Sequence, residues 1–186
     1  MRYISATYHG LPFSFLRVIY TIRSYAMQIT WKGGKSLEIK AKDATILTGD
    51  DVRVNDIVLP GPGEYEVAGV QVFGIAPEIY FFKIDEIACA YFDGINRSLT
   101  DDEVSSLTDA SVIFIPVDGK GVLDPKKATE IIKLLEPTVI IPIEADDITD
   151  FCKVTGGCAQ PVSTYKITKQ QLESMEGQTC VVLEKS

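Results

Sequence analysis

The chain has 186 residues, of which 46% are hydrophobic and 24% are charged, as is ordinary for one globular domain with its own core. Its formal net charge of −8 argues against a nucleic-acid partner, because proteins that bind phosphate backbones usually present a basic patch. No uninterrupted apolar run reaches the ~20 residues of a membrane-spanning helix, so we expect no membrane span. The sequence identifies no partner and leaves assembly into a homo-oligomer open.

The first 26 residues differ in character from the rest of the chain. They carry three arginines and no acidic residue, and their apolar stretch is broken by Arg17. We therefore expect residues 1–26 to be a flexible N-terminal extension and residues 27–186 to form the domain. Three interpretations of the extension stay open: a start site assigned too early, since domain-like sequence begins at Met27; an interfacial membrane anchor; or a segment that packs on the domain.

Short strands separated by turns fill the first half of the expected domain. Alternating apolar and polar residues, with glycine and acidic turns between them, predict strands over 30–39, 44–47, 65–67, 70–73, 79–84 and 87–92. The turn at Ala68-Gly69 makes a hairpin of the third and fourth of these strands.

Three helices are predicted in the second half by their start signals. Each signal pairs a capping residue with a suitable first-turn residue: Thr100 with Glu103, Asp124 with Pro125, and Thr168 with Gln171. The middle helix has an apolar face made of Ala128, Ile131, Ile132 and Leu135.

Buried strands are predicted between these helices. The apolar runs over 112–117 and 139–143 are continuous, as in strands that are covered on both faces, and a closing strand is expected over 180–183. Strands first, followed by alternating strands and helices, predict an α/β (α+β) fold in which two packed sheets carry helices on the outside.

Four stretches carry a resemblance to a known family: 27–34, Gly61-Pro-Gly-Glu-Tyr-Glu-Val67, 99–117 and 135–142. In this order they resemble stretches of the metallo-β-lactamase-fold superfamily, in its branch of Zn-dependent hydrolases similar to ascorbate-6-phosphate lactonase. The stretch from Gly61 is the most specific. The resemblance covers about 27–183 and implies a two-sheet αβ/βα sandwich, truncated because fewer helices are expected than in a full member.

The sequence departs from this family where the resemblance places its chemistry. A His-x-His-x-Asp-His motif should precede Gly61, but residues 46–57 lack both the motif and the helix that follows it. The whole chain has a single histidine, His9. Oxygen donors remain at two positions that match family ligands: Asp93, if a one-residue shift is allowed, and Glu144, where the family has its last histidine.

Asp93 and Glu144 are therefore the candidates for a vestigial site, and no catalytic residue is assigned. We expect no zinc cofactor, although the family uses zinc, because a catalytic zinc site needs about three protein ligands and an open water position. Two carboxylates are ligands for a hard cation at best. Further acids lie in loops that follow strands: Asp50, Asp51, Asp146 and Asp147. Two interpretations stay open: these acids form a loose cation site at the same edge, or they are surface charge without a function. We expect this edge to be open and shallow, with its carboxylates in water.

The four cysteines form no Cys-x-x-Cys pair. Cys89 and Cys180 lie in apolar strand patterns and are expected to be buried. Cys152 and Cys158 flank a Gly-Gly pair, where two more ligands would be needed for zinc. Because no secretory signal is evident, we expect a cytoplasmic protein with reduced thiols.

The sequence thus predicts a metallo-β-lactamase-fold protein that resembles Zn-dependent hydrolases but lacks metal and catalytic activity, and that serves as a binding or scaffold module. The alternative is a metal-dependent hydrolase of a lactone or phosphoester that uses carboxylate ligands or residues of a partner chain. Whether the chain is an enzyme stays open at this point, because hydrolysis of this type needs a metal to lower the pKa of its bound water toward ~7.

Overall fold

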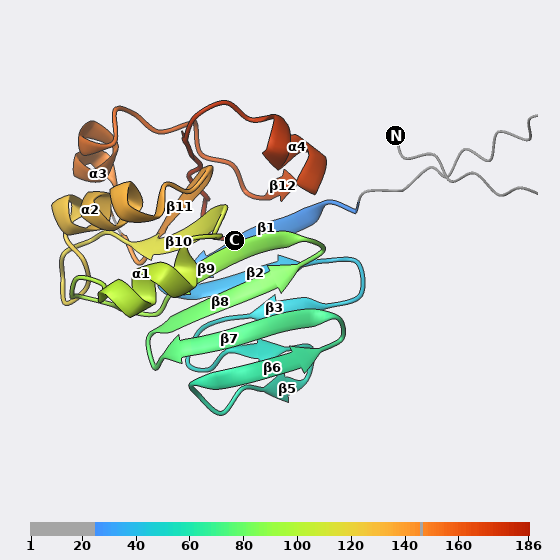
Figure 1. Cartoon of the computed structure of the whole chain (residues 1–186). Helices are drawn as coiled ribbons and strands as arrows, with labels where there is room; N and C mark the ends of the chain where they lie inside the picture. The colour runs from blue at the N-terminus through green and yellow to red at the C-terminus, as the bar shows by residue number, and fades with distance from the viewer. Residues whose placement is uncertain (1–24, 146) are drawn as a thin grey trace, which may run out of the picture.

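Two β-sheets lie at the centre of the computed structural model, which describes residues 25–145 and 147–186 (Figure 1). The first sheet is antiparallel, and its strands are, in spatial order, β12 (Tyr165–Ile167), β1 (Met27–Gly33), β2 (Ser36–Lys40), β3 (Thr45–Leu47), β4 (Arg53–Val54) and β5 (Ile57–Val58). The second sheet is mixed, and its order is β13 (Thr179–Cys180), β11 (Val139–Ile143), β10 (Val112–Pro116), β9 (Ile87–Phe92), β8 (Ile79–Ile84), β7 (Val70–Ala76) and β6 (Gly63–Val67).

The alternation of side chains along the strands divides the core into two layers. In β10, Val112 and Phe114 pack in the layer between the two sheets, whereas Ile113 and Ile115 pack under the helices on the other face of the second sheet. All of these side chains are fully buried. The prediction of strands covered on both faces, made from the continuous apolar runs, is therefore confirmed.

Helices cover the outer face of the second sheet and one end of the sandwich (Figure 1). Their bounds are α1 (Asp101–Leu107), α2 (Pro125–Leu135), α3 (Thr149–Val154) and α4 (Lys169–Ser174). Thr100 and Glu103 form the predicted capping box of α1, and the Asp124 carboxylate caps α2 by accepting from the backbone N–H groups of Lys126 and Lys127. The three predicted helix starts are confirmed.

The architecture is an αβ sandwich of the expected kind, but some elements differ from the prediction. The closing strand is shorter than predicted: β13 covers Thr179–Cys180, while Leu183 makes an isolated bridge to Val162. Strands β4, β5 and β12 were not predicted, because elements of two or three residues contain too little periodicity to be recognised.

The structure corrects the expectation of reduced thiols. Cys152 and Cys158 form a disulfide with an S–S distance of 2.07 Å, while Cys89 and Cys180 are free and buried, as predicted. The two cysteines are only 6 residues apart in the chain, so their side chains can meet across the end of α3.

The expected boundary between extension and domain falls at the edge of the described residues. Strand β1 begins at Met27, where domain-like sequence was expected to begin, and residues 1–24 lie outside the described residues. In the part of the chain that the structure describes, no helix is both long enough and apolar enough to cross a membrane.

Candidate functional site

Parallel strands bring the two predicted site residues together. Strands β9, β10 and β11 run parallel, with Cys89, Val112 and Val139 in register, so their carboxyl ends lie at one edge of the second sheet. Asp93 directly follows β9 and Glu144 directly follows β11. The backbone N–H of Gly94 donates to the Glu144 carboxylate over 3.0 Å, which places the two strand ends side by side.

Lys35, in the turn between β1 and β2, reaches this edge from the first sheet. Its ammonium nitrogen lies 3.1 Å from Oδ1 of Asp93. Its backbone carbonyl accepts hydrogen bonds from the hydroxyl groups of Tyr91, at 2.9 Å, and Thr48, at 2.7 Å. Three contacts therefore fix this lysine, and its turn closes the first sheet onto the second at the position of the carboxylates.

Glu144 also links the two sheets through its own backbone. Its N–H donates to the carbonyl of Gly34 over 3.0 Å, and its φ of 50° lies in the left-handed region. A residue other than glycine held in this region costs on the order of 1–3 kcal/mol, and the conformation persists only where its surroundings enforce it. The bonds to Gly34 and Gly94 supply that enforcement, so Glu144 has a structural role at this edge.

The electrostatic environment shifts the protonation of Glu144. Burial raises the pKa of the Glu144 carboxyl above its ordinary value, the hydrogen bond from Gly94 acts in the opposite direction, and the neighbouring charge of Asp93 raises it further. Burial likewise raises the pKa of the Tyr91 hydroxyl, so that this group stays protonated and donates its hydrogen bond. The expectation of carboxylates in water was thus wrong for Glu144, which is half-buried.

The residues at this edge do not fit the zinc ion that the family resemblance implies. Zinc requires a cluster of nitrogen, sulfur or carboxylate ligands, and residues 25–145 and 147–186 contain no group of three or more His, Cys, Asp or Glu side chains that could hold a metal. The Lys35 ammonium lies at the Asp93 carboxylate, and one Glu144 oxygen already accepts an N–H. A cation at Asp93 would have to compete with the Lys35 ammonium for this carboxylate.

Two of the other acids of the expected site, Asp51 and Asp147, interact elsewhere. The carboxylate of Asp51 pairs with Arg53 at 2.6 Å, and this pairing lowers the pKa of Asp51. Asp147 accepts a hydrogen bond from the backbone N–H of Thr149 at the start of α3, over 2.8 Å. Asp146 lies outside the described residues. Neither Asp51 nor Asp147 therefore adds a ligand to the pair at the sheet edge.

A pocket of about 310 Å³ adjoins Glu144 at this edge. This volume is at the lower end of the range for small-molecule sites. The pocket combines one aromatic ring with charges of both signs, and it is lined by Trp31, Gly33, Gly34, Asp118, Lys120, Val122, Glu144, Ala145 and Lys185. The ammonium of Lys120 lies 3.3 Å from Asp118.

Sequence reasoning missed Trp31, Lys35 and Lys185 as site residues. Lys185 comes from the C-terminal end of the chain, and Trp31 forms an isolated bridge with it. Only the Gly33-Gly34 turn offered a signal, since two adjacent glycines at the end of a strand allow other segments to approach closely. That signal indicates a turn and does not specify what the turn contacts.

A comparison with known families identifies the superfamily of this chain. The sequence profile of the beta-lactamase superfamily domain matches residues 48–144, which is just over half of the 186 residues. The chain therefore belongs to the β-lactamase superfamily. No curated protein matches it.

Two solved structures share the fold. A candidate Zn-dependent hydrolase of the metallo-β-lactamase superfamily from Thermotoga maritima has 22% sequence identity and a TM-score of 0.74, over 85% of this chain and 99% of that chain. Igni18, a metallo hydrolase from the hyperthermophilic archaeon Ignicoccus hospitalis, has 12% identity and a TM-score of 0.55, over 77% of this chain and 98% of that chain. At these identities the likenesses show the fold alone.

Proposed function

We propose that this chain is a binding module of the β-lactamase superfamily that has no metal and no hydrolytic activity. The observation that carries the proposal is the position of Lys35, whose ammonium group lies 3.1 Å from Asp93 at the edge where the family resemblance places metal ligands. Here a side chain of the protein supplies the positive charge beside the carboxylate.

An ammonium group cannot replace a metal in hydrolysis. Hydrolysis by this superfamily's type of chemistry needs an ion that binds a water molecule and lowers its pKa toward ~7. Lysine has three N–H donors and no coordination position for water, so it neutralises Asp93 without creating a nucleophile. The Tyr91 hydroxyl does not supply one either, because burial keeps its pKa above the ordinary value.

The pocket beside Glu144 is the part of the edge suited to binding. Trp31 offers an apolar face, and its ring N–H is already bonded to the carbonyl of Gly34 at 2.8 Å, so the ring is held in place. Lys120, Asp118 and Lys185 place charged groups around the same space. Such a combination of one fixed aromatic ring and a few polar groups suits a small polar ligand.

The first test separates a binding module from a hydrolase. The protein is incubated with zinc, dialysed, analysed for metal, and assayed against lactone, phosphodiester and β-lactam substrates. We expect much less than one zinc per chain and no hydrolysis above the rate of buffer. One tightly held zinc per chain, together with turnover of any of these substrates, would support the alternative of a metal-dependent hydrolase that uses Asp93, Glu144 or a partner's residues.

The second test measures binding at the pocket. Trp31 is the single tryptophan of the chain, so intrinsic tryptophan fluorescence reports on this pocket without a label. The same lactones and phosphoesters are titrated into the protein, into Lys185→Ala within the pocket, and into Lys166→Ala as a matched control on β12. A ligand of the proposed site should shift the fluorescence of the wild type and the control, and bind several-fold more weakly to Lys185→Ala. Equal binding to all three would place the ligand elsewhere.

A further inference from the structure

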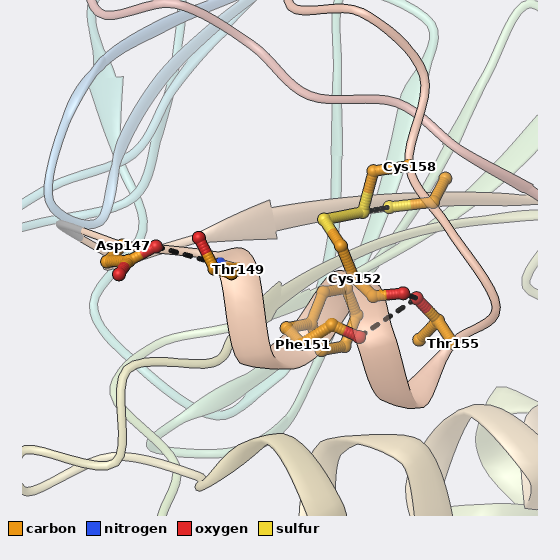
Figure 2. Close-up of a disulfide and its surroundings, with 7 residues drawn as sticks. Asp147, Thr149, Phe151, Cys152, Thr155 and Cys158 are labelled. Atoms are coloured by element: carbon orange, nitrogen blue, oxygen red, sulfur yellow. Dashed lines mark hydrogen bonds between the residues drawn. A yellow bond between two sulfur atoms is a disulfide. The ribbon is translucent and has the colours of Figure 1, made fainter.

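The sulfur atoms of three of the four cysteines meet at one place, between α3 and β13. Cys152, on α3, is joined to Cys158 by the disulfide shown in Figure 2. The thiol sulfur of Cys180, on β13, lies 3.2 Å from the sulfur of Cys158. Cys158 is therefore bonded to one cysteine and in direct contact with another.

The backbone holds Cys158 between these two cysteines. On one side, the N–H of Gly157 donates to the carbonyl of Cys152 over 2.7 Å. On the other side, the N–H of Ala159 donates to the carbonyl of Cys180 over 3.1 Å. Cys180 is in turn fixed by pairing of β13 with β11, in register with Ile140. These hydrogen bonds hold Cys158 within reach of both cysteines.

We propose that these three residues form a thiol–disulfide exchange site, in which Cys158 alternates between Cys152 and Cys180 as its disulfide partner. The thiolate of Cys180 attacks the sulfur of Cys158, the new Cys158–Cys180 bond forms, and the Cys152–Cys158 bond breaks. Cys152 leaves as a thiolate and takes up the proton that Cys180 has lost. One disulfide and one thiol are present before and after the exchange, so no external oxidant or reductant is required.

The exchange moves the free thiol from the interior to the surface. The side chain of Cys180 is buried, whereas Cys152 is partly exposed and lines a surface hollow with Ile148, Thr149, Lys153, Gly156 and Gly157. A thiol that leaves the core for this hollow becomes accessible to reagents and to other disulfides. The chemical class that the site accepts is therefore a small thiol, a disulfide or an alkylating electrophile.

The attacking group determines how fast the exchange proceeds. Burial raises the pKa of Cys180 to about 11, so little thiolate is present at neutral pH. Only the thiolate attacks a disulfide. As long as the pH stays below the pKa, the thiolate fraction rises roughly tenfold with each unit by which the pH increases. The exchange should accordingly be slow at pH 7 and about tenfold faster at pH 8.

The test on the wild-type protein maps the thiol and the disulfide together. The full chain is incubated with iodoacetamide at pH 7 and pH 8, digested without reduction, and analysed by mass spectrometry. We expect alkylation of Cys152 to accumulate together with the Cys158–Cys180 linkage, at a rate that is independent of protein concentration. Persistence of the Cys152–Cys158 linkage alone at both pH values, or a protein that holds no disulfide after treatment with oxidised glutathione, would overturn the proposal.

Variants test the role of each sulfur atom. Cys180→Ser should lose the alkylation at Cys152 and retain Cys152–Cys158. Cys152→Ser, treated with oxidised glutathione, should form Cys158–Cys180 with release of two glutathione thiols. Cys89→Ser is the matched control, because Cys89 is also buried but contacts the sulfur of Met27 at 3.9 Å. Wild-type behaviour of Cys180→Ser would contradict the exchange; should that variant fail to fold, the wild-type map still decides.

Discussion

The ammonium group of Lys35 lies 3.1 Å from the carboxylate of Asp93, and the pair joins the first sheet to the end of a strand of the second. The two side chains are 36% and 21% exposed, so solvent screens much of their attraction. A pair of this kind contributes about 0–1 kcal/mol to the free energy of unfolding. Its importance for function is therefore its position, since it neutralises a carboxylate that would otherwise be free to bind a cation.

Replacing Lys35 should open a weak cation site at a small cost in stability. Lys35→Ala removes the ammonium but leaves the backbone carbonyl that Tyr91 and Thr48 donate to. We expect a loss of at most about 1 kcal/mol in urea unfolding, together with weak binding of Mn²⁺ measured by titration calorimetry. Lys32→Ala, which breaks an exposed pair with Glu38 at 3.6 Å, is the control and should bind no Mn²⁺.

The same Mn²⁺ titration is carried out on a double variant that combines Lys35→Ala with Asp93→Asn. It decides whether Asp93 is the ligand. Binding that survives the second substitution would show that the cation binds elsewhere, and that Lys35 does not shield Asp93.

Neutralising Glu144 should not destabilise the protein at neutral pH. Because burial raises the pKa of this carboxyl, the folded state holds its proton more tightly than the unfolded state, and the free energy of unfolding falls as pH rises above about 4.5. Glu144→Gln keeps an oxygen that can accept from Gly94 and removes the charge. We expect a thermal midpoint at pH 7 equal to or above that of the wild type, with the difference shrinking toward pH 4.

The exposed helical residue Glu130 provides the comparison for Glu144, and Glu130→Gln is the matched variant that removes one carboxylate charge. A Glu144→Gln variant that is clearly less stable at pH 7 would show that the charge itself stabilises this edge.

The charge of the Glu103 carboxylate, unlike that of Glu144, should raise the free energy of unfolding at neutral pH. It accepts two hydrogen bonds of 2.8 Å from Arg97, and this pairing lowers its pKa to about 2. Stability from this group is present above the ordinary pKa of 4.5 and is lost as pH falls toward about 2. Glu103→Gln should therefore cost about 2 kcal/mol in urea unfolding at pH 7 and much less at pH 3.

Asp102→Asn is the control for Glu103, because Asp102 is exposed in the same first turn of α1. An equal loss of stability in Glu103→Gln at pH 7 and pH 3 would show that the negative charge of Glu103 in its pair with Arg97 is not the main contribution.

Local signals in the sequence predicted the starts of helices correctly. Contacts between segments that are distant in the chain could not be predicted in this way. The start of α1 follows from Thr100 and Glu103, because a capping box satisfies backbone groups within three residues. The partner of Asp93 did not follow, since Lys35 is brought to it only by the packing of one sheet on the other. Parallel pairing of β9 and β11 through β10 was needed to place Asp93 beside Glu144, and the family resemblance supplied that expectation.

Gly74 illustrates a requirement for glycine that the sequence alone did not reveal. A Cβ atom at this position of β7 would lie 2.8 Å from the carbonyl oxygen of Gly61 and 2.9 Å from Cα of Pro62. Both neighbours are backbone atoms and cannot rotate away. Gly74→Ala should lower the free energy of unfolding by about 1–3 kcal/mol, as overpacking does. Gln71→Ala, at an exposed position of the same strand, is the control, and a loss no larger than in this control would contradict the close approach.

The remaining prediction concerns the boundary of the domain. A chain that begins at Met27 retains every described strand and helix, because β1 begins at this residue and Met27 itself is fully buried. We expect a folded protein whose thermal midpoint is within about 2 °C of that of the full chain, since 1 kcal/mol corresponds to roughly 2–4 °C in a domain of this size. A chain that begins at Tyr25 separates the cost of a new terminal ammonium at buried Met27 from the loss of the preceding segment. If both shortened chains lose several degrees, residues before Tyr25 pack on the domain; if both match the full chain, residues 27–186 are the folding unit.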